Sequence, residues 1–260
     1  MPILKNSLIG FLLSFQFFSS LPIRKQLPMN SQTVTTMYIM LPILGILMGC
    51  SLNILHLVNE QSVQVSALLF AVLVAVAGIV MTGGLHLDGW IDMGDAYFSY
   101  QDQKKRLEIL EDSRVGAFGA ICLVVLLLLK IGFIFELLIN ETPNLSFYFL
   151  AIPFLSRLAL LVYFSATDTV KETGLAAYFK SSVNPTKILS AIIIYILLFS
   201  MLTYLLVGIN GIILIGCMLL FVFLFRKWTI RNFGGMTGDL LGALNEGTEV
   251  FLWGILLLFI

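Results

Sequence analysis

The sequence predicts an all-α, polytopic integral membrane protein with about seven transmembrane helices and an additional N-terminal interfacial or re-entrant helix. Of the 260 residues, 59% are hydrophobic and only 12% are charged, and the mean hydropathy is +0.99. A soluble domain carries about 25% charged residues. Long apolar runs recur along the chain, and lysine and arginine fall in alternate loops. We expect residues 1–260 to form a single membrane-embedded domain, with the lipid bilayer as a partner.

A helix that crosses a bilayer needs about 20 mainly apolar residues. Candidate spans are residues 34–57, 63–82, 115–139, 147–166, 188–207, 211–225 and 239–259. Residues 4–21 are shorter, end at Pro22 and contain polar Ser14 and Gln16. We predict an interfacial or re-entrant helix there, and a tilted span stays open.

The distribution of positive charge predicts the orientation of these spans, because lysine and arginine favour the cytoplasmic side. The connections at 58–61, 140–146 and 208–210 carry neither residue type. The other connections are basic, through Arg24, Lys25, Lys104, Lys105, Arg106, Arg114, Lys171, Lys180, Lys187, Arg226, Lys227 and Arg231. We therefore expect the long polar loops to face the cytoplasm of a bacterial inner membrane. Because the formal net charge is zero, no overall field favours nucleic acid as a partner.

The longest polar interval, residues 83–114, holds seven of the fifteen acidic residues. It begins GGLHLDGWIDMGDA, in which Asp88, Asp92 and Asp95 recur at i, i+4 and i+7 and so share one helical face. Like charges at this spacing repel one another, and carboxylates are preferred ligands of Mg2+. The pattern predicts a divalent-cation site, with a solvated acidic face as the alternative. The preceding pair of glycines permits a tight turn.

Neighbouring polar residues are candidates for the same site. His86 could bind metal or exchange a proton, or it could be a hydrogen-bonded interfacial histidine. The segment RLEILEDSRVGAFG at 106–119 places Asp112 and Arg114 where the next span begins. The planar guanidinium groups of Arg106 and Arg114 suit phosphate. A role in topology and lipid contact is the alternative for these basic residues.

A second polar segment, GGMTGDLLGALNEGTE at 234–249, opens the last predicted helix. A glycine-rich turn before a helix can present backbone N–H groups to an anion. Thr237 and Asp239 are also good helix caps. Asp239 and Glu246 recur down one face into the membrane, where ionisable residues are candidates for function. Arg157, deep in its span, is a candidate for the same reason.

Taken together, these motifs resemble the cobalamin synthase family, formally adenosylcobinamide-GDP ribazoletransferase. The resemblance rests on three motifs: GGLHLDG at 83–89 with Asp92 and Asp95, LEI at 107–109 with DSRVGAFG at 112–119, and GGMTGD at 234–239 with Gly242, Ala243 and Glu246. FSSLP at 18–22 is similar to the N-terminal segment of that family. It therefore runs from near the N-terminus to the last helix. Trp90, Ile91 and Ala96 depart from the expected pattern, which affects the detail of the substrate pocket but leaves all three aspartates in place.

The resemblance implies a Mg2+-dependent membrane transferase of the last stage of cobalamin assembly. Such an enzyme joins adenosylcobinamide-GDP to alpha-ribazole, or its 5'-phosphate, and releases GMP. We assign as metal ligands Asp88, Asp92 and Asp95, with Asp112 and Asp239 as further candidates. The candidate catalytic residues are Asp88, Asp92, Asp95, Asp112 and Arg114. The candidate substrate-binding residues are His86, Arg106, Arg157, Thr237, Asp239 and Glu246. The identity of the general base and the number of metal ions stay open. The oligomeric state also stays open, and a homo-oligomer is possible.

Two other functions are compatible with acidic residues on membrane helices. A CDP-alcohol phosphotransferase-like enzyme performs the same class of displacement, but the Ala-Arg pair and the later two-aspartate spacing expected of it are missing here. An ion transporter would line a path through the bilayer with carboxylates. In this sequence the acidic residues crowd at one surface instead, apart from Glu136 and Glu249.

Overall fold

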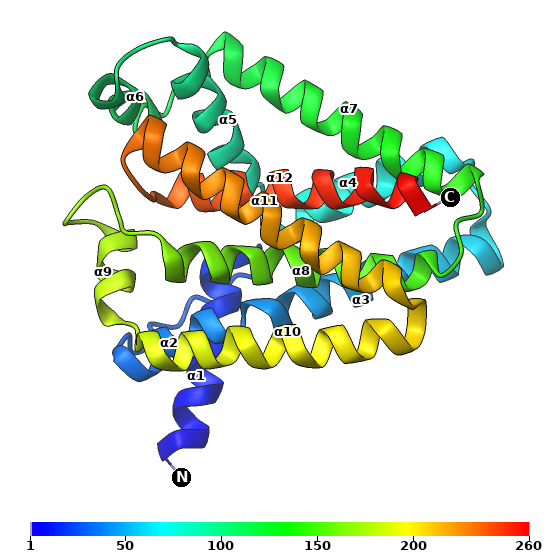
Figure 1. The fold of residues 1–260 in the computed structure, drawn as a ribbon, viewed down its shortest axis with the longest axis horizontal. Helices are drawn as coiled ribbons and strands as arrows, with labels where there is room; N and C mark the ends of the chain where they lie inside the picture. The colour runs from blue at the N-terminus through cyan, green and yellow to red at the C-terminus, as the bar shows by residue number, and fades with distance from the viewer. Residues whose placement is uncertain (1, 260) are drawn as a thin grey trace.

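The computed structural model describes residues 2–259, which fold into helices joined mostly by short loops (Figure 1). The predicted all-α class is confirmed for these residues. The helices are α1 (Pro2–Phe18), α2 (Ser31–Ile39), α3 (Leu41–Val58), the π-helix η1 (Asn59–Val63), α4 (Ala67–Thr82), α5 (Leu85–Phe98), α6 (Gln103–Leu110), α7 (Ala117–Ile139), α8 (Leu145–Ala166), α9 (Leu175–Ser182), α10 (Pro185–Val207), α11 (Ile209–Phe233), α12 (Gly238–Leu256) and the 3-10 helix η2 (Leu257–Phe259).

Six helical segments within residues 2–259 are long and apolar enough to cross a membrane, and a bent pair raises the number to as many as seven. The six contain α3, α7, α8, α10, α11 and α12, and the bent pair is α4 with α5. The prediction of about seven spans is therefore confirmed. The 17-residue α1 is not among the six. In Figure 1 it projects at a steep angle from the long helices.

The first predicted span, residues 34–57, is wrong in its boundaries. The chain breaks at Met40, so α2 and α3 are separate helices, and the spanning segment runs from Leu41 to Val63. Pro42 lies at the start of α3, where its missing N–H is tolerated, whereas inside a continuous helix it would remove a hydrogen bond. Asn30 closes the other end of α2 with a capping box.

Helices α8 and α12 form the inside of the bundle. The share of buried residues in the most apolar stretch of the helix is 78% for α8 and 78% for α12, but only 17% for α10. Helix α3 packs against α8 through Gly45 and Gly49, a small-residue pair that lets helices approach closely in membranes. A Cβ atom at Gly49 would lie 2.8 Å from the Leu150 Cα, so the two backbones are in contact there.

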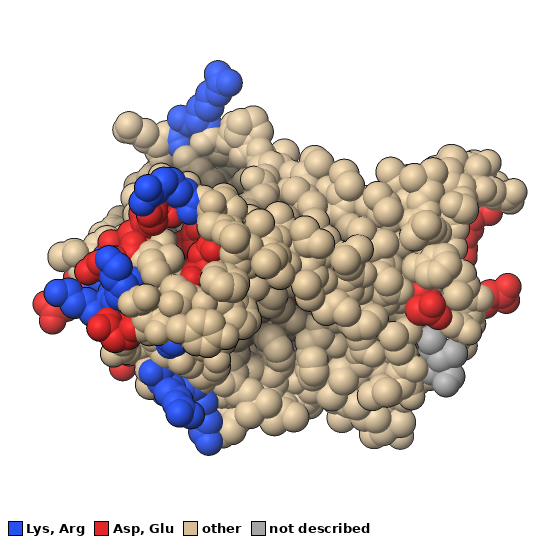
Figure 2. Space-filling model, turned by 90° about the horizontal axis from the view of Figure 1, so that it is seen from above, with Lys and Arg blue, Asp and Glu red and all other residues tan. Residues whose placement is uncertain are grey.

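Charged side chains mark one end of the bundle. Figure 2 shows the lysine and arginine side chains of the visible face gathered at the end where α5, α6 and α9 lie, beside most of the visible acidic ones. The middle of that face is free of charge. This arrangement agrees with the predicted alternation of basic and charge-poor loops. We call this region the charged end of the molecule.

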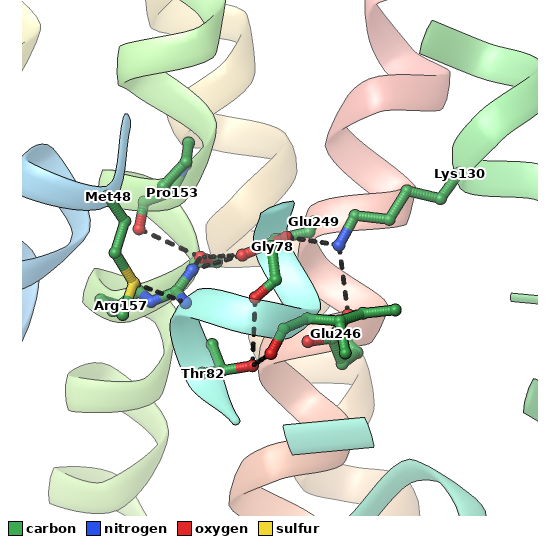
Figure 3. Close-up of polar contacts among 10 residues, drawn as sticks. Met48, Gly78, Thr82, Lys130, Pro153, Arg157, Glu246 and Glu249 are labelled. Atoms are coloured by element: carbon green, nitrogen blue, oxygen red, sulfur yellow. Dashed lines mark hydrogen bonds and ion pairs between the residues drawn. The ribbon is translucent and has the colours of Figure 1, made fainter. Parts of the chain in front are cut away.

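Inside the bundle, α12 is joined to its neighbours by a network of buried ion pairs (Figure 3). The Lys130 Nζ of α7 lies 2.7 Å from a Glu249 oxygen and 3.2 Å from a Glu246 oxygen. Arg157 of α8 pairs with the other Glu249 oxygen, and its second terminal nitrogen donates to the Met48 Sδ of α3 at 3.2 Å. All four charged side chains are buried. The network therefore connects α3, α7, α8 and α12.

Two cations and two carboxylates give this network a net charge of zero. A charged residue at the centre of a spanning helix costs about 2.5–3.5 kcal/mol on insertion scales. Removing one partner of a buried pair costs about 3–5 kcal/mol, because the other charge stays behind uncompensated. Balance between the four charges is therefore a condition for the stability of the bundle.

The network predicts a stability effect that depends on charge balance. Lys130→Met leaves two carboxylates facing one arginine, so we expect the free energy of unfolding to fall by about 3–5 kcal/mol. Adding Glu246→Leu removes the surplus carboxylate and should restore most of that loss. Circular dichroism during titration from mild detergent into SDS measures both variants, with exposed Lys187→Met as the control. A double variant as unstable as the sum of its single variants would contradict this account.

Candidate active site

The predicted acidic helix exists as α5, which leaves α4 at an angle of 96°. Gly83 and Gly84 form the corner with φ values of 66° and 78°, a left-handed conformation that favours glycine. Because α4 runs with the bundle, a bend of this size directs α5 across the ends of the spanning helices. Helix α5 therefore crosses the charged end of the bundle, packed against the first turns of α7 and α12 (Figure 1).

Two glycines bring α5 and the start of α12 into backbone contact. A Cβ atom at Gly89 would lie 2.8 Å from the Asp239 Cα, and one at Gly242 would lie 3.1 Å from the His86 Cα. No side chain fits between the two helices at either position. The contact places Asp239 beside the acidic face of α5.

The aspartates of α5 and α12 influence one another electrostatically. Burial, followed by the negative charges of Asp88, Asp239 and Asp95, raises the pKa of Asp92 to about 7. Burial is the larger cause, and the three neighbouring carboxylates add repulsion that also disfavours the ionised form. A divalent cation would offset that repulsion, and a set of carboxylates is suited to Mg2+.

Within residues 2–259, no three carboxylate, imidazole or thiol groups converge into a formed metal site. The metal-ligand assignment of Asp88, Asp92 and Asp95 therefore stays a prediction. The chemistry of the donors fits Mg2+, which binds through one or two carboxylates and completes its shell with water and substrate phosphate. Asp88, Asp92 and Asp239 are the carboxylates that could hold it.

Asp95 has a separate structural role. Its two oxygens accept hydrogen bonds from the backbone N–H groups of Gly116 and Gly119, at 2.7 and 2.8 Å. These groups belong to the first turn of α7, where amides have no partner within the helix. A Cβ atom at Gly119 would lie 2.7 Å from the Ile91 Cγ2, so glycine is needed for the close approach. Asp95 thus anchors α7 to α5.

The candidate residues of segment 106–119 are engaged with other partners. Arg114 and Asp112 pair with each other, with the Arg114 Nη2 2.6 Å from the Asp112 Oδ2, and this pairing lowers the pKa of Asp112 to about 2. The Arg114 side chain is 86% exposed, so it is free to reorient toward a ligand. The Arg106 Nη1 donates to the Asn232 Oδ1 at 2.7 Å, which joins α6 to α11.

The remaining candidates occupy three different environments. Arg157 and Glu246 belong to the buried ion-pair network and make no contact with α5 among the hydrogen bonds and ion pairs of residues 2–259. Thr237 caps α12, because its Oγ1 accepts from the Leu240 N–H at 3.2 Å. His86 is buried, and neither ring nitrogen has a hydrogen-bond partner in the described part of the chain.

Two cavities meet at Asp239. The first, which we call the polar cavity, has a volume of about 230 Å³ and is lined by Glu111, Thr169, Lys171, Thr173, Thr237 and Asp239 among others. The second, the aromatic cavity, has a volume of about 190 Å³. Its walls include Phe17, Phe18, Tyr38, Leu160, Phe179 and Leu241, and His86, Asp88 and Asp239 are its polar lining residues. Gly238, Leu175 and Ala176 also line both cavities. Two ligands could therefore reach one aspartate from different sides.

The sequence interpretation missed the contribution of the loop before α9. Residues 167–174, TDTVKETG, are rich in hydroxyl and charged side chains, and this composition is the feature of the sequence that indicates a ligand-binding loop. The loop pairs with the turn before α12, because Val170 N–H donates to the Met236 carbonyl at 3.1 Å and Met236 N–H donates to the Asp168 carbonyl at 2.9 Å. Lys171 also forms an ion pair with Glu111 beside the polar cavity.

Comparison with known proteins identifies the family. The family model for cobalamin-5-phosphate synthase matches residues 10–257. The chain is 36% identical over 252 residues to an adenosylcobinamide-GDP ribazoletransferase of Geobacillus sp. (strain WCH70), covering 96% of this chain and 95% of the relative. It is 34% identical over 260 residues to the protein of the same name from Halalkalibacterium halodurans, covering 98% of each. No solved structure matches the chain. The match of the family model to residues 10–257 and the matches to relatives over 95% or more of their length show that the chain belongs to the cobalamin-5-phosphate synthase family.

Proposed function

We propose that the chain is an adenosylcobinamide-GDP ribazoletransferase, which joins adenosylcobinamide-GDP to alpha-ribazole, or its 5'-phosphate, and releases GMP. The observation that carries this proposal is the match over 96% of the chain to a relative with that name. The structure supports a reaction of two substrates, because two cavities of different character share Asp239.

The reaction is a displacement at phosphorus. An alcohol oxygen of the acceptor forms a bond to the phosphorus next to cobinamide, and the bond from that phosphorus to the bridging oxygen breaks. GMP leaves with the bridging oxygen, and a carboxylate of the cluster receives the proton of the alcohol. Catalysis of such a step rests on positioning and on stabilisation of the charge on the phosphoryl oxygens.

Bound Mg2+ would supply that charge stabilisation. We propose that Asp88 and Asp92 hold it, with Asp239 as a third carboxylate in place of the predicted Asp95. The backbone contact between Gly89 and Asp239 supports this exchange, as do the two amide hydrogen bonds to Asp95.

Recognition of the nucleotide phosphates falls in the polar cavity. Lys171 is the cationic side chain of its lining, and the hydroxyl groups of Thr169, Thr173 and Thr237 are neutral donors beside it. We therefore propose Lys171 in place of Arg157 as a phosphate contact. Arg157 is buried with Glu249 inside the bundle, whereas the Lys171 side chain, although paired with Glu111, is 46% exposed.

The transporter alternative is weakened by the same pairing. A carboxylate path through the bilayer needs groups that are free to bind an ion. Glu246 and Glu249 are instead neutralised by Lys130 and Arg157 in a tightly packed region, where the cavity volume is about 20 Å³.

We propose that the charged end faces the cytoplasm, because the basic loops lie there. Tyr100, which is 83% exposed beside α5, tests this orientation. An impermeant maleimide should label a Tyr100→Cys variant in inside-out vesicles and leave it unlabelled in intact cells. Glu60→Cys, in η1 directly after α3, should be labelled in intact cells and not in inside-out vesicles. Labelling of the unsubstituted protein, through its three native cysteines, is subtracted in both cases. Labelling of Tyr100→Cys in intact cells would contradict the orientation.

The activity and its metal requirement can be tested together. With Mg2+, adenosylcobinamide-GDP and alpha-ribazole, the purified protein is expected to release GMP and form a cobalamin in equal amounts. EDTA should abolish both products, and excess Mg2+ should restore them. Chromatography of the reaction measures the two products. Turnover that survives chelation contradicts the metal proposal, and absence of cobalamin in every condition contradicts the proposed reaction.

The carboxylate cluster predicts a large loss on conservative substitution. Asp92→Asn keeps the size of the side chain and removes its charge, so we expect kcat to fall by about 10²-fold or more, the loss typical for a group that stabilises transition-state charge. Asp102→Asn is the matched control, because asparagine also caps a helix well and Asp102 caps α6 outside the cavities. GMP release from equal amounts of monodisperse protein measures both. Asp92→Asn at wild-type turnover would refute the role assigned to this carboxylate.

A further inference from the structure

The aromatic cavity has rigid walls contributed by helices far apart in the sequence. The rings of Phe17 in α1 and Phe179 in α9 meet edge to face, with 5.2 Å between their centroids. Tyr38 in α2 stacks on Phe164 at 3.8 Å and meets Phe18 edge to face at 6.0 Å. Each of these rings is held by another ring. The cavity therefore offers fixed aromatic surface, which suits a flat aromatic ligand.

The same cavity carries polar groups that lack partners. Its lining includes Asp88 and Asp239 of the carboxylate cluster and His86, which is 2% exposed. Both ring nitrogens of His86 are buried without a hydrogen bond in the described residues. Buried polar groups are normally satisfied by protein, water or ligand. Each of the His86 nitrogens exposes less than 1 Å² of surface, so Asp88 and Asp239 are the lining groups that can present polar atoms to a ligand in this cavity.

From these features we propose that the aromatic cavity is the binding site for the base of the acceptor nucleoside. This inference rests on the proposed function, in which the acceptor is a neutral bicyclic aromatic base joined to a ribose. The base would stack against the half-buried rings of Phe17 and Phe18, with Tyr38 behind Phe18, and the ribose would point to Asp239. The alcohol oxygen then lies next to the carboxylates that receive its proton.

Size and charge distinguish the two substrates. A volume of about 190 Å³ is below the roughly 300–1,000 Å³ typical of sites that enclose drug-sized ligands. It suits a bicyclic base and excludes a corrin macrocycle. The diphosphate of the other substrate needs cationic and hydroxyl partners, which the polar cavity supplies through Lys171 and Thr173. The two substrates thus approach Asp239 from the two cavities.

Steady-state kinetics test this assignment through the two Michaelis constants. Loss of one stacking ring in Phe18→Ala should raise the KM for alpha-ribazole about 10-fold, the lower end of the effect of removing a base-stacking aromatic side chain. The KM for adenosylcobinamide-GDP should change less than twofold. Phe18→Leu, which keeps most of the apolar volume, should show the same selectivity if the alanine variant does not fold. Thr173→Ala in the polar cavity is the matched control, and it should raise the KM for adenosylcobinamide-GDP alone.

The outcomes separate failure of this inference from failure of the proposed function. If the wild-type protein forms no cobalamin, the proposed function itself is wrong. An active wild-type protein whose Phe18 variants raise both KM values equally, or only that for adenosylcobinamide-GDP, overturns the base site. Loss of a co-purifying phospholipid in the variants, with an unchanged KM for alpha-ribazole, would assign the cavity to a lipid chain and also overturn it.

Discussion

The arrangement of the molecule depends on the charge balance between Lys130, Arg157, Glu246 and Glu249 inside the bundle. The bilayer supplies no water to an unpaired charge, so these side chains hold α12 at one depth and one rotation against α7 and α8. Asp239 is seven to ten residues earlier on the same helix, which is about 10–15 Å along its axis. A network without contact to the cavities thus sets the position of the aspartate that both cavities share.

Glycines extend this positioning from α12 to the rest of the site. Gly89 and Gly242 let α5 lie directly on the start of α12, and Gly119 lets α7 approach close enough for Asp95 to bind its first amides. The contacts at Gly89 and Gly242 are between backbones, which cannot reorient as side chains do, and at Gly119 the Asp95 carboxylate is fixed by two backbone amides. The acidic face of α5 is therefore held on two sides, by α12 and by α7, and its carboxylates are kept together against their mutual repulsion.

Much of this fold could be predicted because periodicity and charge are local signals. The corner at Gly83, the acidic helix and the ends of most spans follow from neighbouring residues. The break at Met40 was missed, because the apolar run continues across it. Arg157 and Glu246 were assigned to substrate because an unpaired intramembrane charge implies function, whereas their partners are distant in sequence: Lys130 precedes Glu246 by 116 residues. The spacing of Asp88, Asp92 and Asp95 predicts a shared metal site, and no local signal indicates that the oxygens of Asp95 bind the amides of α7.

The sizes of the cavities bear on why this reaction occurs at a membrane surface. Volumes of about 230 and 190 Å³ leave the corrinoid part of the proposed donor outside the helices, at the charged end. Helix α9 lines both cavities there, residues 167–174 line the polar cavity, and the backbone pairing of Val170 with Met236 connects this loop to the turn before α12. A large substrate of mixed polarity can rest at the lipid–water boundary while its phosphate reaches Asp239. Under the proposed function, the protein needs to enclose the reacting phosphate and the acceptor base, and the membrane surface accommodates the rest.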